Sequence, residues 1–233
     1  MKKDVIEFYQ AQSDQLSQYL PMTKNIEKIF TFARNVSSLA NYRFILGVAT
    51  WRRGGDPVPY LSEGLDVLEE HIPEIVHIDP AAASTRALHT EVAAVFAWLT
   101  RQTFSHEPLP EEINYPDGRL TALLLAELKG TPDRTAVNEV LKAFAHKKRH
   151  ALAVKTFQNY FDILDRASAG QSLEDLVKFG SELYGQREHD AFYSGGPRLE
   201  GGGPGTDDLI DYRLGAVLKH VRYTGDSVHV WRW

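Results

Sequence analysis

Apolar residues recur along the chain at the three- and four-residue spacing of an amphipathic α-helix. The clearest run covers residues 26–51, where Ile26 and Ile29 begin a series that continues to Trp51. A second apolar set lies on the other side of the C-terminal part of this run. We therefore predict a long central helix that is covered from two directions and that ends at the glycine pair 54–55.

Capping and helix-breaking residues divide the rest of the chain into further helices. Asp56 followed by Pro57 is typical of a helix start, and the prolines at 73 and 80 predict a loop after about residue 71. Ser84 is placed to cap the next helix. The expected helices cover residues 56–71, 84–104, 120–129, 134–168, 172–183 and 207–221, with a disturbed helical phase at 146–150.

The segment SHEPLPEEINYPDG separates two halves of the chain. Its three prolines lack backbone donors, and its four acidic residues, with no basic residue among them, disfavour packing. The predicted domains are an N-terminal helical unit over residues 1–104, an acidic proline-rich linker over 105–118 and a C-terminal helical unit over 119–233.

The two halves share a short sequence pattern. YRFIL at 42–46 and YFDIL at 160–164 are each followed by a glycine break and by a helix that contains a glycine, Gly64 or Gly180. Internal duplication and the chance similarity of amphipathic helices both explain this pattern. We expect an all-α fold with two tandem helical-hairpin units, packed as a helical bundle or a short α-solenoid.

A glycine-rich segment near the C-terminus interrupts the helical pattern. Residues 193–206, YSGGPRLEGGGPGT, hold six glycines and two prolines, which predicts a long surface loop. We treat the whole stretch from Arg187 to Asp211 as part of a loop region that binds a partner. Alternating residues in the tail, SVHVWRW at 227–233, predict a short strand or an extended segment.

The composition is that of a folded, water-soluble protein. Hydrophobic residues make up 43% and charged residues 24% of the 233 positions. The absence of cysteine excludes disulfides, thiolate zinc sites and a cysteine nucleophile. The first twenty residues lack the apolar core of a signal peptide, and no apolar run is long enough to span a membrane. We therefore expect a cytoplasmic protein with no membrane partner.

The distribution of charge argues against nucleic-acid binding. The net charge is −5, and the segments 1–104, 105–118 and 119–233 carry −2, −4 and +1. A nucleic-acid-binding surface needs a basic face or stripe, and neither half of the chain is strongly basic. We expect no nucleic-acid partner, and a mildly acidic surface suits a basic protein partner better.

The sequence holds no recognisable catalytic or cofactor motif. It has no metal-ligand spacing such as HExxH and no GxSxG, and its glycine-rich segment lacks the lysine of a phosphate-binding loop. We therefore expect no cofactor, no metal and no catalytic residue. The alternative is a helical metal-dependent hydrolase in which folding brings together His189, Asp190, Asp207 and Asp211.

Several residues have the chemistry of a protein interface. Trp51 and Arg52 end the central helix, and tryptophan and arginine are enriched at interface hot spots, although core packing also explains the tryptophan. The carboxylates at 207, 208 and 211 suit either helix capping or binding. The candidate partner-binding residues are Trp51, Arg52, Arg187, Glu188, Asp190, Tyr193, Arg198, Glu200, Asp207, Asp208 and Asp211.

Two stretches carry a resemblance to a known family. NYRFILGVATWRRGGDPVPYLSEGLDVLEEHI, followed in the second half by a helix, a glycine- and aromatic-rich loop and DYRLGAVLKHV, resembles the PoNi-like all-helical immunity proteins of bacterial polymorphic toxin systems. The resemblance implies a cytoplasmic inhibitor that binds a cognate toxin domain and blocks its active site, often with acidic residues against a basic nuclease. The long glycine-rich segment and the WRW ending depart from that pattern. A helical-repeat adaptor for the cell's own proteins is a further alternative.

Overall fold

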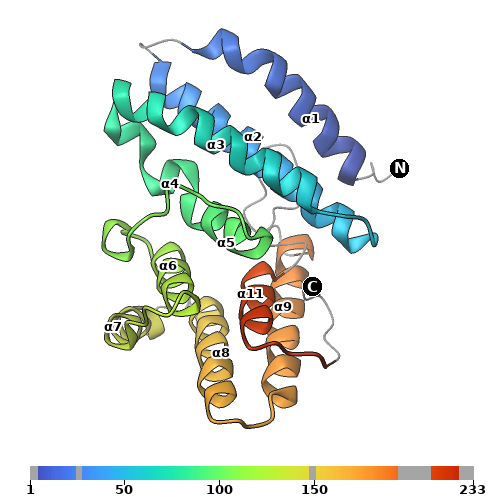
Figure 1. Ribbon diagram of the computed structural model, residues 1–233, viewed down its shortest axis with the longest axis vertical. Helices are drawn as coiled ribbons and strands as arrows, with labels where there is room; N and C mark the ends of the chain where they lie inside the picture. Colours follow the sequence, from blue (N-terminus) through green and yellow to red (C-terminus); the bar gives the residue numbers. More distant parts are fainter. Residues whose placement is uncertain (1–4, 25–27, 147–150, 194–210, 226–233) are drawn as a thin grey trace. The chain divides into compact units, whose positions relative to one another are not determined.

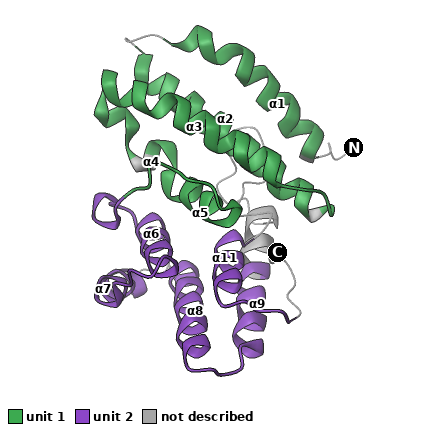
Figure 2. Ribbon diagram, viewed as in Figure 1, with its two compact units in different colours: residues 1–108 green, residues 109–233 purple. Residues whose placement is uncertain are grey.

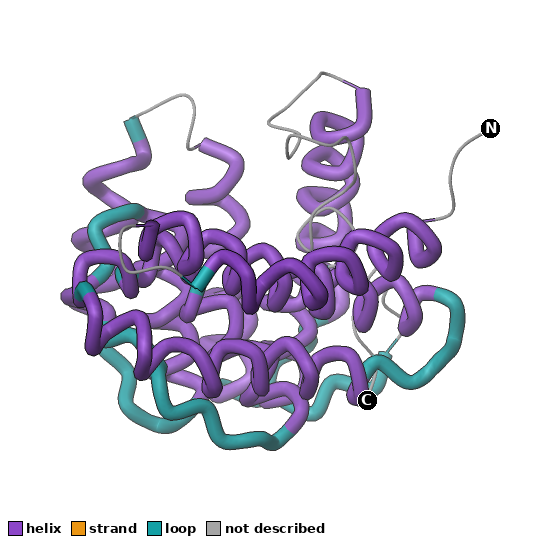
Figure 3. Tube along the Cα trace, turned by 90° about the horizontal axis from the view of Figure 1, so that it is seen from above, coloured by secondary structure: helices purple, strands orange, loops and turns teal. Residues whose placement is uncertain are grey.

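The structure is a computed structural model, and its described residues form helices joined by turns and loops, without a strand (Figure 3). The all-α prediction is confirmed. No helix in the described part of the chain combines the length and hydropathy of a membrane span. The predicted strand or extended tail at 227–233 lies outside the described residues. These are residues 5–24, 28–146, 151–193 and 211–225.

The chain folds as two compact units, Met1–Pro108 and Leu109–Trp233 (Figure 2). Their boundary lies inside the segment predicted as a linker. We refer to them as unit 1 and unit 2. Besides the α-helices, the described residues form the short 3-10 turns η1 (Leu20–Thr23), η3 (Pro80–Ala83) and η4 (Pro110–Glu112).

Unit 1 is built on a hairpin of two long helices (Figure 1). α2 (Ile29–Arg52) is the predicted central helix, and both α3 (Val58–Ile78) and α1 (Val5–Tyr19) pack along it. The turn between α2 and α3 needs Gly54, because its φ of 80° is a conformation that favours glycine. The central helix is therefore covered from two directions, as its two apolar sets predict.

The helices of this hairpin approach each other closely at Gly64. A Cβ atom added to Gly64 would lie 2.5 Å from a ring carbon of Phe44 and 3.1 Å from the carbonyl oxygen of Ala40. A larger residue would therefore push α3 away from α2. Seven apolar side chains of the two helices have 0% exposure, namely Val36, Ile45, Leu46, Val48, Leu61, Leu68 and Ile75.

α3 continues past the point where a loop is predicted. Pro73 lies inside the helix, although proline removes one helical hydrogen bond. Ile72 and Ile75, on either side of it, are buried at 3% and 0% exposure. The apolar area that these two residues bury offsets the lost hydrogen bond. The predicted helix end near residue 71 is therefore wrong.

The helix predicted over residues 84–104 is two helices. α4 (Thr85–Leu88) and α5 (Thr90–Thr100) are separated by His89, whose φ of 52° is left-handed, and Arg101, with a φ of 59°, ends α5. α5 packs on α3 and is buried on nearly all sides. A helix that is apolar all round has no amphipathic phase. Its hydrophobic pattern therefore does not mark where it begins or ends.

In the described part of unit 2, α8 is the helix that packs against each of the others. Its side chains Tyr160 and Ile163 are both fully buried. The segment 134–168, predicted as one helical region with a disturbance, is divided into α7 and α8. The helices of unit 2 are α6 (Pro116–Leu128), α7 (Arg134–Ala145), α8 (Ala151–Ser168), α9 (Glu174–Tyr193) and α11 (Tyr212–His220).

The segment predicted as a linker is partly folded. α6 begins inside it at Pro116, because proline is well tolerated in the first turn of a helix, and Ile113 is only 2% exposed. In unit 1, the backbone N–H of Ser105 donates a hydrogen bond to Glu69, and His106 lies 3.7 Å from the same carboxylate. The two ends of the segment therefore pack as parts of folded units.

The two hairpins resemble each other at their turns and crossings. α8 is followed by Gly170, with a φ of 66°, just as α2 is followed by Gly54. Ten residues later in each case comes a glycine, Gly180 or Gly64, at which a Cβ atom would clash with the neighbouring helix. The third helices differ, because α5 packs on α3 whereas α11 packs mainly on α8 and α6. The similarity extends to the hairpins and not to the complete units.

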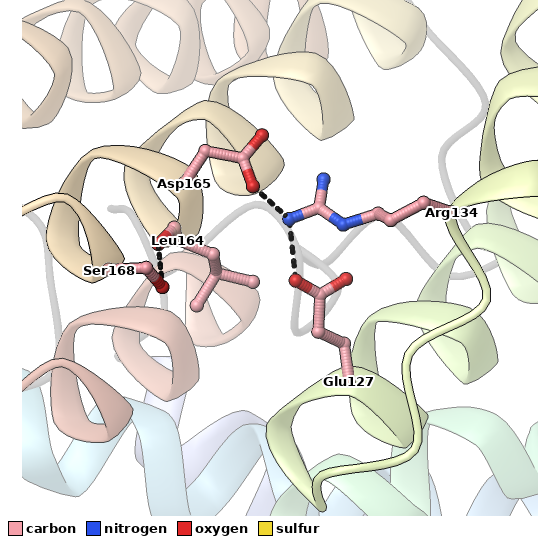
Figure 4. A network of polar contacts seen from close by, with 5 residues as sticks. All are labelled: Glu127, Arg134, Leu164, Asp165 and Ser168. Carbon is pink, nitrogen blue, oxygen red and sulfur yellow. Dashed lines mark hydrogen bonds and ion pairs between the residues drawn. The ribbon is translucent and has the colours of Figure 1, made fainter.

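An ion-pair network joins three helices of unit 2 (Figure 4). The Nη2 atom of Arg134 on α7 lies 2.5 Å from Oε1 of Glu127 on α6 and 2.6 Å from Oδ1 of Asp165 on α8. The guanidinium of Arg134 also lies over the ring of Phe161, 4.8 Å from its centroid. Burial raises the pKa of Glu127, although the charge of Arg134 opposes this shift.

We predict that Glu127→Gln gains stability relative to the parent protein as the pH rises from about 4 to about 7. Because the folded-state pKa of Glu127 is raised, protonation favours the folded state, and this contribution is lost as the pH rises through that pKa. Glutamine keeps the shape and one acceptor for Arg134 but has no charge to bury. Urea unfolding at several pH values measures the difference in free energy.

Asp175→Asn provides the contrasting case. A hydrogen bond from Arg166, 2.7 Å long, lowers the pKa of Asp175 below its usual 3.8. The stability from Asp175 is therefore present above that value and is lost on acidification. Asp175→Asn should lose stability relative to the parent as the pH rises through about 4. If Glu127→Gln changed in the same direction as Asp175→Asn, the interpretation of Glu127 would be wrong.

Candidate functional site

One side of α3 is apolar and buried, and the opposite side is acidic and exposed. Its 21 residues include no lysine and no arginine. Leu61, Leu65, Leu68, Ile72 and Ile75 are buried on one side, and four of the five carboxylates of α3 recur at three- and four-residue spacing on the other. We call this second side the acidic face of α3, formed by Glu63, Asp66, Glu70 and Glu74.

Cations from α2 and the chain before it pair with the two ends of this acidic face. Nη1 of Arg43 lies 3.0 Å from Oε2 of Glu63, and Nζ of Lys24 lies 2.8 Å from Oε2 of Glu74. In the described part of the chain, no lysine or arginine pairs with Asp66 or Glu70 at its centre. The side chain of Glu70 is 75% exposed and lies 3.9 Å from His71. The centre of the face therefore keeps its negative charge.

This arrangement suits recognition of a basic protein surface. The ion pairs of Arg43 and Lys24 are partly exposed, and exposed ion pairs add little to stability, typically about 0–1 kcal/mol. Carboxylates that project from a helix with a buried opposite face are held in place before a partner arrives. Their charge acts over roughly 8–10 Å at physiological salt, which is enough to orient an approaching basic partner.

Trp51 and Arg52, predicted as binding residues, are the last two residues of α2. Trp51 is partly exposed, and its carbonyl oxygen accepts a 2.8 Å hydrogen bond from the backbone N–H of Gly54. The side chain of Arg52 lies outside the described part of the structure. Both residues belong to unit 1 and all the other candidates to unit 2, so the fold of either unit alone does not bring the whole set together.

The predicted loop region from Arg187 begins as a helix. α9 continues to Tyr193, so Arg187, Glu188, Asp190 and Tyr193 are on its last two turns. The loop prediction is therefore wrong for these four residues. Gly185 and the polar sequence after it, QREHD, have no apolar phase that would have extended the predicted helix. The side chains of these residues lie outside the described part, and their binding role stays a prediction.

Four further candidates lie in the sequence between α9 and α11. Arg198, Glu200, Asp207 and Asp208 are all outside the described residues. Their proposed role in partner binding therefore stays a prediction as well.

Asp211 caps α11 from a buried position. Its Oδ1 atom accepts a 2.9 Å hydrogen bond from the backbone N–H of Leu214, which is the N-cap arrangement. The hydroxyl of Tyr160 on α8 donates to both carboxylate oxygens, at 2.7 and 2.8 Å. Asp211 is only 6% exposed. The capping role is confirmed, and the partner-binding role of Asp211 stays a prediction.

The metal-dependent hydrolase alternative gains no support from these positions. Asp207 lies outside the described residues, as do the side chains of His189 and Asp190, and Asp211 is held by Tyr160 and by its own helix. In the described part of the chain, no three histidine, aspartate or glutamate residues are arranged to hold a metal ion.

Sequence reasoning missed two groups of residues. The acidic face of α3 has helical spacing that was visible in the sequence, but α3 was expected to end at about residue 71. Arg213, which is 6% exposed, donates from Nε to the hydroxyl of Thr121 at 2.8 Å and lies over the ring of Tyr212. No local pattern marks this arginine as buried.

Comparison with known proteins identifies no relative. No family model, no curated protein and no solved structure matches the chain.

We predict that Asp211→Ala lowers the free energy of unfolding by about 2 kcal/mol or more, because it removes a helix cap and leaves the buried hydroxyl of Tyr160 without its acceptor. Chemical denaturation measures this loss. Asp162→Ala is the control, since Asp162 is exposed on α8, and its change should stay within about 0.5 kcal/mol. Equal effects of the two substitutions would contradict the structural role of Asp211.

Proposed function

We propose that the protein is a cytoplasmic immunity protein that binds and occludes a cognate antibacterial toxin domain. The observation that carries this proposal is the acidic face of α3, a regular row of carboxylates on the exposed side of a helix whose other side is buried. The resemblance of the hairpin sequence to PoNi-like immunity proteins supports the same function. A toxin with a basic active-site surface, such as a nuclease, is the partner that this charge would complement.

Occlusion needs an interface that is large enough for stable binding and a surface that is already ordered. A 21-residue helix is about 30 Å long at 1.5 Å per residue. That length can cross an interface of roughly 1,200–2,000 Å² in total. Because α3 is held by a fully buried row of apolar residues, binding along it would require little further ordering of the backbone.

The direct experiment is co-expression with the product of the adjacent upstream gene in a bacterial host. We expect the neighbouring product to be toxic alone, and we expect this protein to restore growth and to co-purify with it in a stable complex. Toxicity that persists despite expression of folded protein would contradict the proposal. Co-purification with a host protein, without rescue, would favour the helical adaptor instead.

We predict that the double variant Asp66→Lys/Glu70→Lys binds the toxin more slowly, with an association rate constant lowered by about tenfold or more at low salt. The two carboxylates lie at the centre of the acidic face, where neither a lysine nor an arginine of the described residues pairs with them, so reversing their charge removes the attraction that orients a basic partner. Stopped-flow association at several salt concentrations measures both the rate constant and its salt dependence.

The matched control is Glu139→Lys/Asp162→Lys, which makes the same change in net charge at two exposed residues of α7 and α8. If steering depends on the acidic face of α3, this control should change the rate much less than the α3 variant does. Equal rate constants for the two double variants would show that only the net charge matters and would remove α3 from the binding surface. Thermal unfolding of both variants checks that the fold is retained.

A further inference from the structure

An amide in the middle of α8 is buried without hydrogen bonds. Asn159 is 1% exposed, and neither its Nδ2 nor its Oδ1 atom has a hydrogen-bond partner among the described residues. Buried polar groups in folded proteins are nearly always paired, and an unpaired one costs the free energy of its lost hydration. This side chain therefore weakens the packing of which it is a part.

α9 is the helix that lies against this amide. A Cβ atom added to Gly180 on α9 would come within 2.7 Å of Nδ2 of Asn159 and 3.1 Å of a methyl carbon of Leu214. Only the absence of a side chain at Gly180 allows the backbone of α9 to approach so closely. The backbone amides of that turn are already used within the helix and leave Asn159 without a partner.

Three polar side chains near Asn159 on these two helices are paired. The hydroxyl of Tyr160, the next residue along α8, donates to Asp211. Thr156 and Ser181 donate from their hydroxyls to the carbonyl oxygens of Leu152 and Val177, four residues earlier in their own helices. The unpaired amide is thus a local feature of the contact between α8 and α9.

The part of α9 whose side chains are described has its buried residues close together along the helix. Among its residues with described side chains, Val177, Gly180, Leu183 and Tyr184 are buried, which covers about two turns. The helix continues for nine more residues to Tyr193. The unpaired amide of Asn159 lies against Gly180, inside these two turns.

We propose that the contact between α8 and α9 is a conformational joint, at which α9 separates from α8 more readily than the rest of unit 2 unfolds. Separation would let water or a partner reach Asn159 and complete its hydrogen bonds. Arg187, Glu188, Asp190 and Tyr193 would move with α9. This inference goes beyond the proposed function, because it concerns the motion of unit 2 and is tested without a partner.

Hydrogen exchange of the full-length protein tests the joint. In the parent protein, amides in the 176–184 segment of α9 should exchange through a local opening that needs less denaturant than exchange in α8. Asn159→Leu keeps the number and branching of the side-chain heavy atoms, is somewhat larger, and has no polar atoms to satisfy. We expect it to slow exchange in this segment on the order of tenfold and to raise the thermal midpoint.

Asn41→Leu is the matched control, because Asn41 also precedes a tyrosine inside a long helix but is only half-buried. It repeats the gain in helix propensity without removing a buried unpaired amide. Asn159→Ala is the second variant, in case leucine does not fit beside Gly180. The proposal is overturned if neither Asn159 variant slows exchange in α9 more than Asn41→Leu does, or if α9 and α8 exchange together in the parent.

Discussion

In both units, two long helices cross at a glycine whose missing side chain leaves room for the helix opposite. In unit 1 the glycine is Gly64, and the group that it meets is the buried ring of Phe44. In unit 2 the glycine is Gly180, and the group is the unpaired amide of Asn159. A close approach gains most from dispersion and apolar burial when both surfaces are apolar. The same backbone arrangement therefore holds α3 firmly and α9 less firmly.

The firm attachment of α3 determines how its carboxylates can act. Burial of one face fixes the rotation of the helix about its axis, so the acidic face stays exposed. Exposed carboxylates contribute little to folding stability, so their charge is free to act on the rate at which a partner associates. Lysine and arginine pair with Glu63 and Glu74, whereas no lysine or arginine among the described residues pairs with Asp66 or Glu70. On this helix, the apolar residues that stabilise the fold are therefore different from the carboxylates that would act on a partner.

Helical spacing predicted the all-α fold and the central helix, because burial of an amphipathic face leaves a periodic pattern. It failed where tertiary packing overrides local signals. Pro73 stays inside α3 because Ile72 and Ile75 are buried beside it, and the break at His89 has no counterpart in the apolar pattern. Capping by Asp211 could be predicted locally, but its partner Tyr160 is 51 residues away in the sequence. The spacing of the acidic face of α3 is present in the sequence. Its full length was not predicted, because a loop was expected at Pro73.

Adjacent residues of α8 make different contacts with two of its neighbours, α9 and α11. Successive side chains of a helix point about 100° apart, so Asn159 and Tyr160 serve different contacts. Tyr160 ties α11 to α8 through a buried carboxylate, whereas Asn159 gives α9 no polar bond. The two candidate binding surfaces therefore differ in rigidity. The acidic face of α3 is ordered before a partner binds and suits the steering of that partner. Residues on α9 would take up fixed positions only when α9 is packed against α8. Their contribution would appear in how slowly a complex dissociates, because contacts formed after encounter lower the dissociation rate.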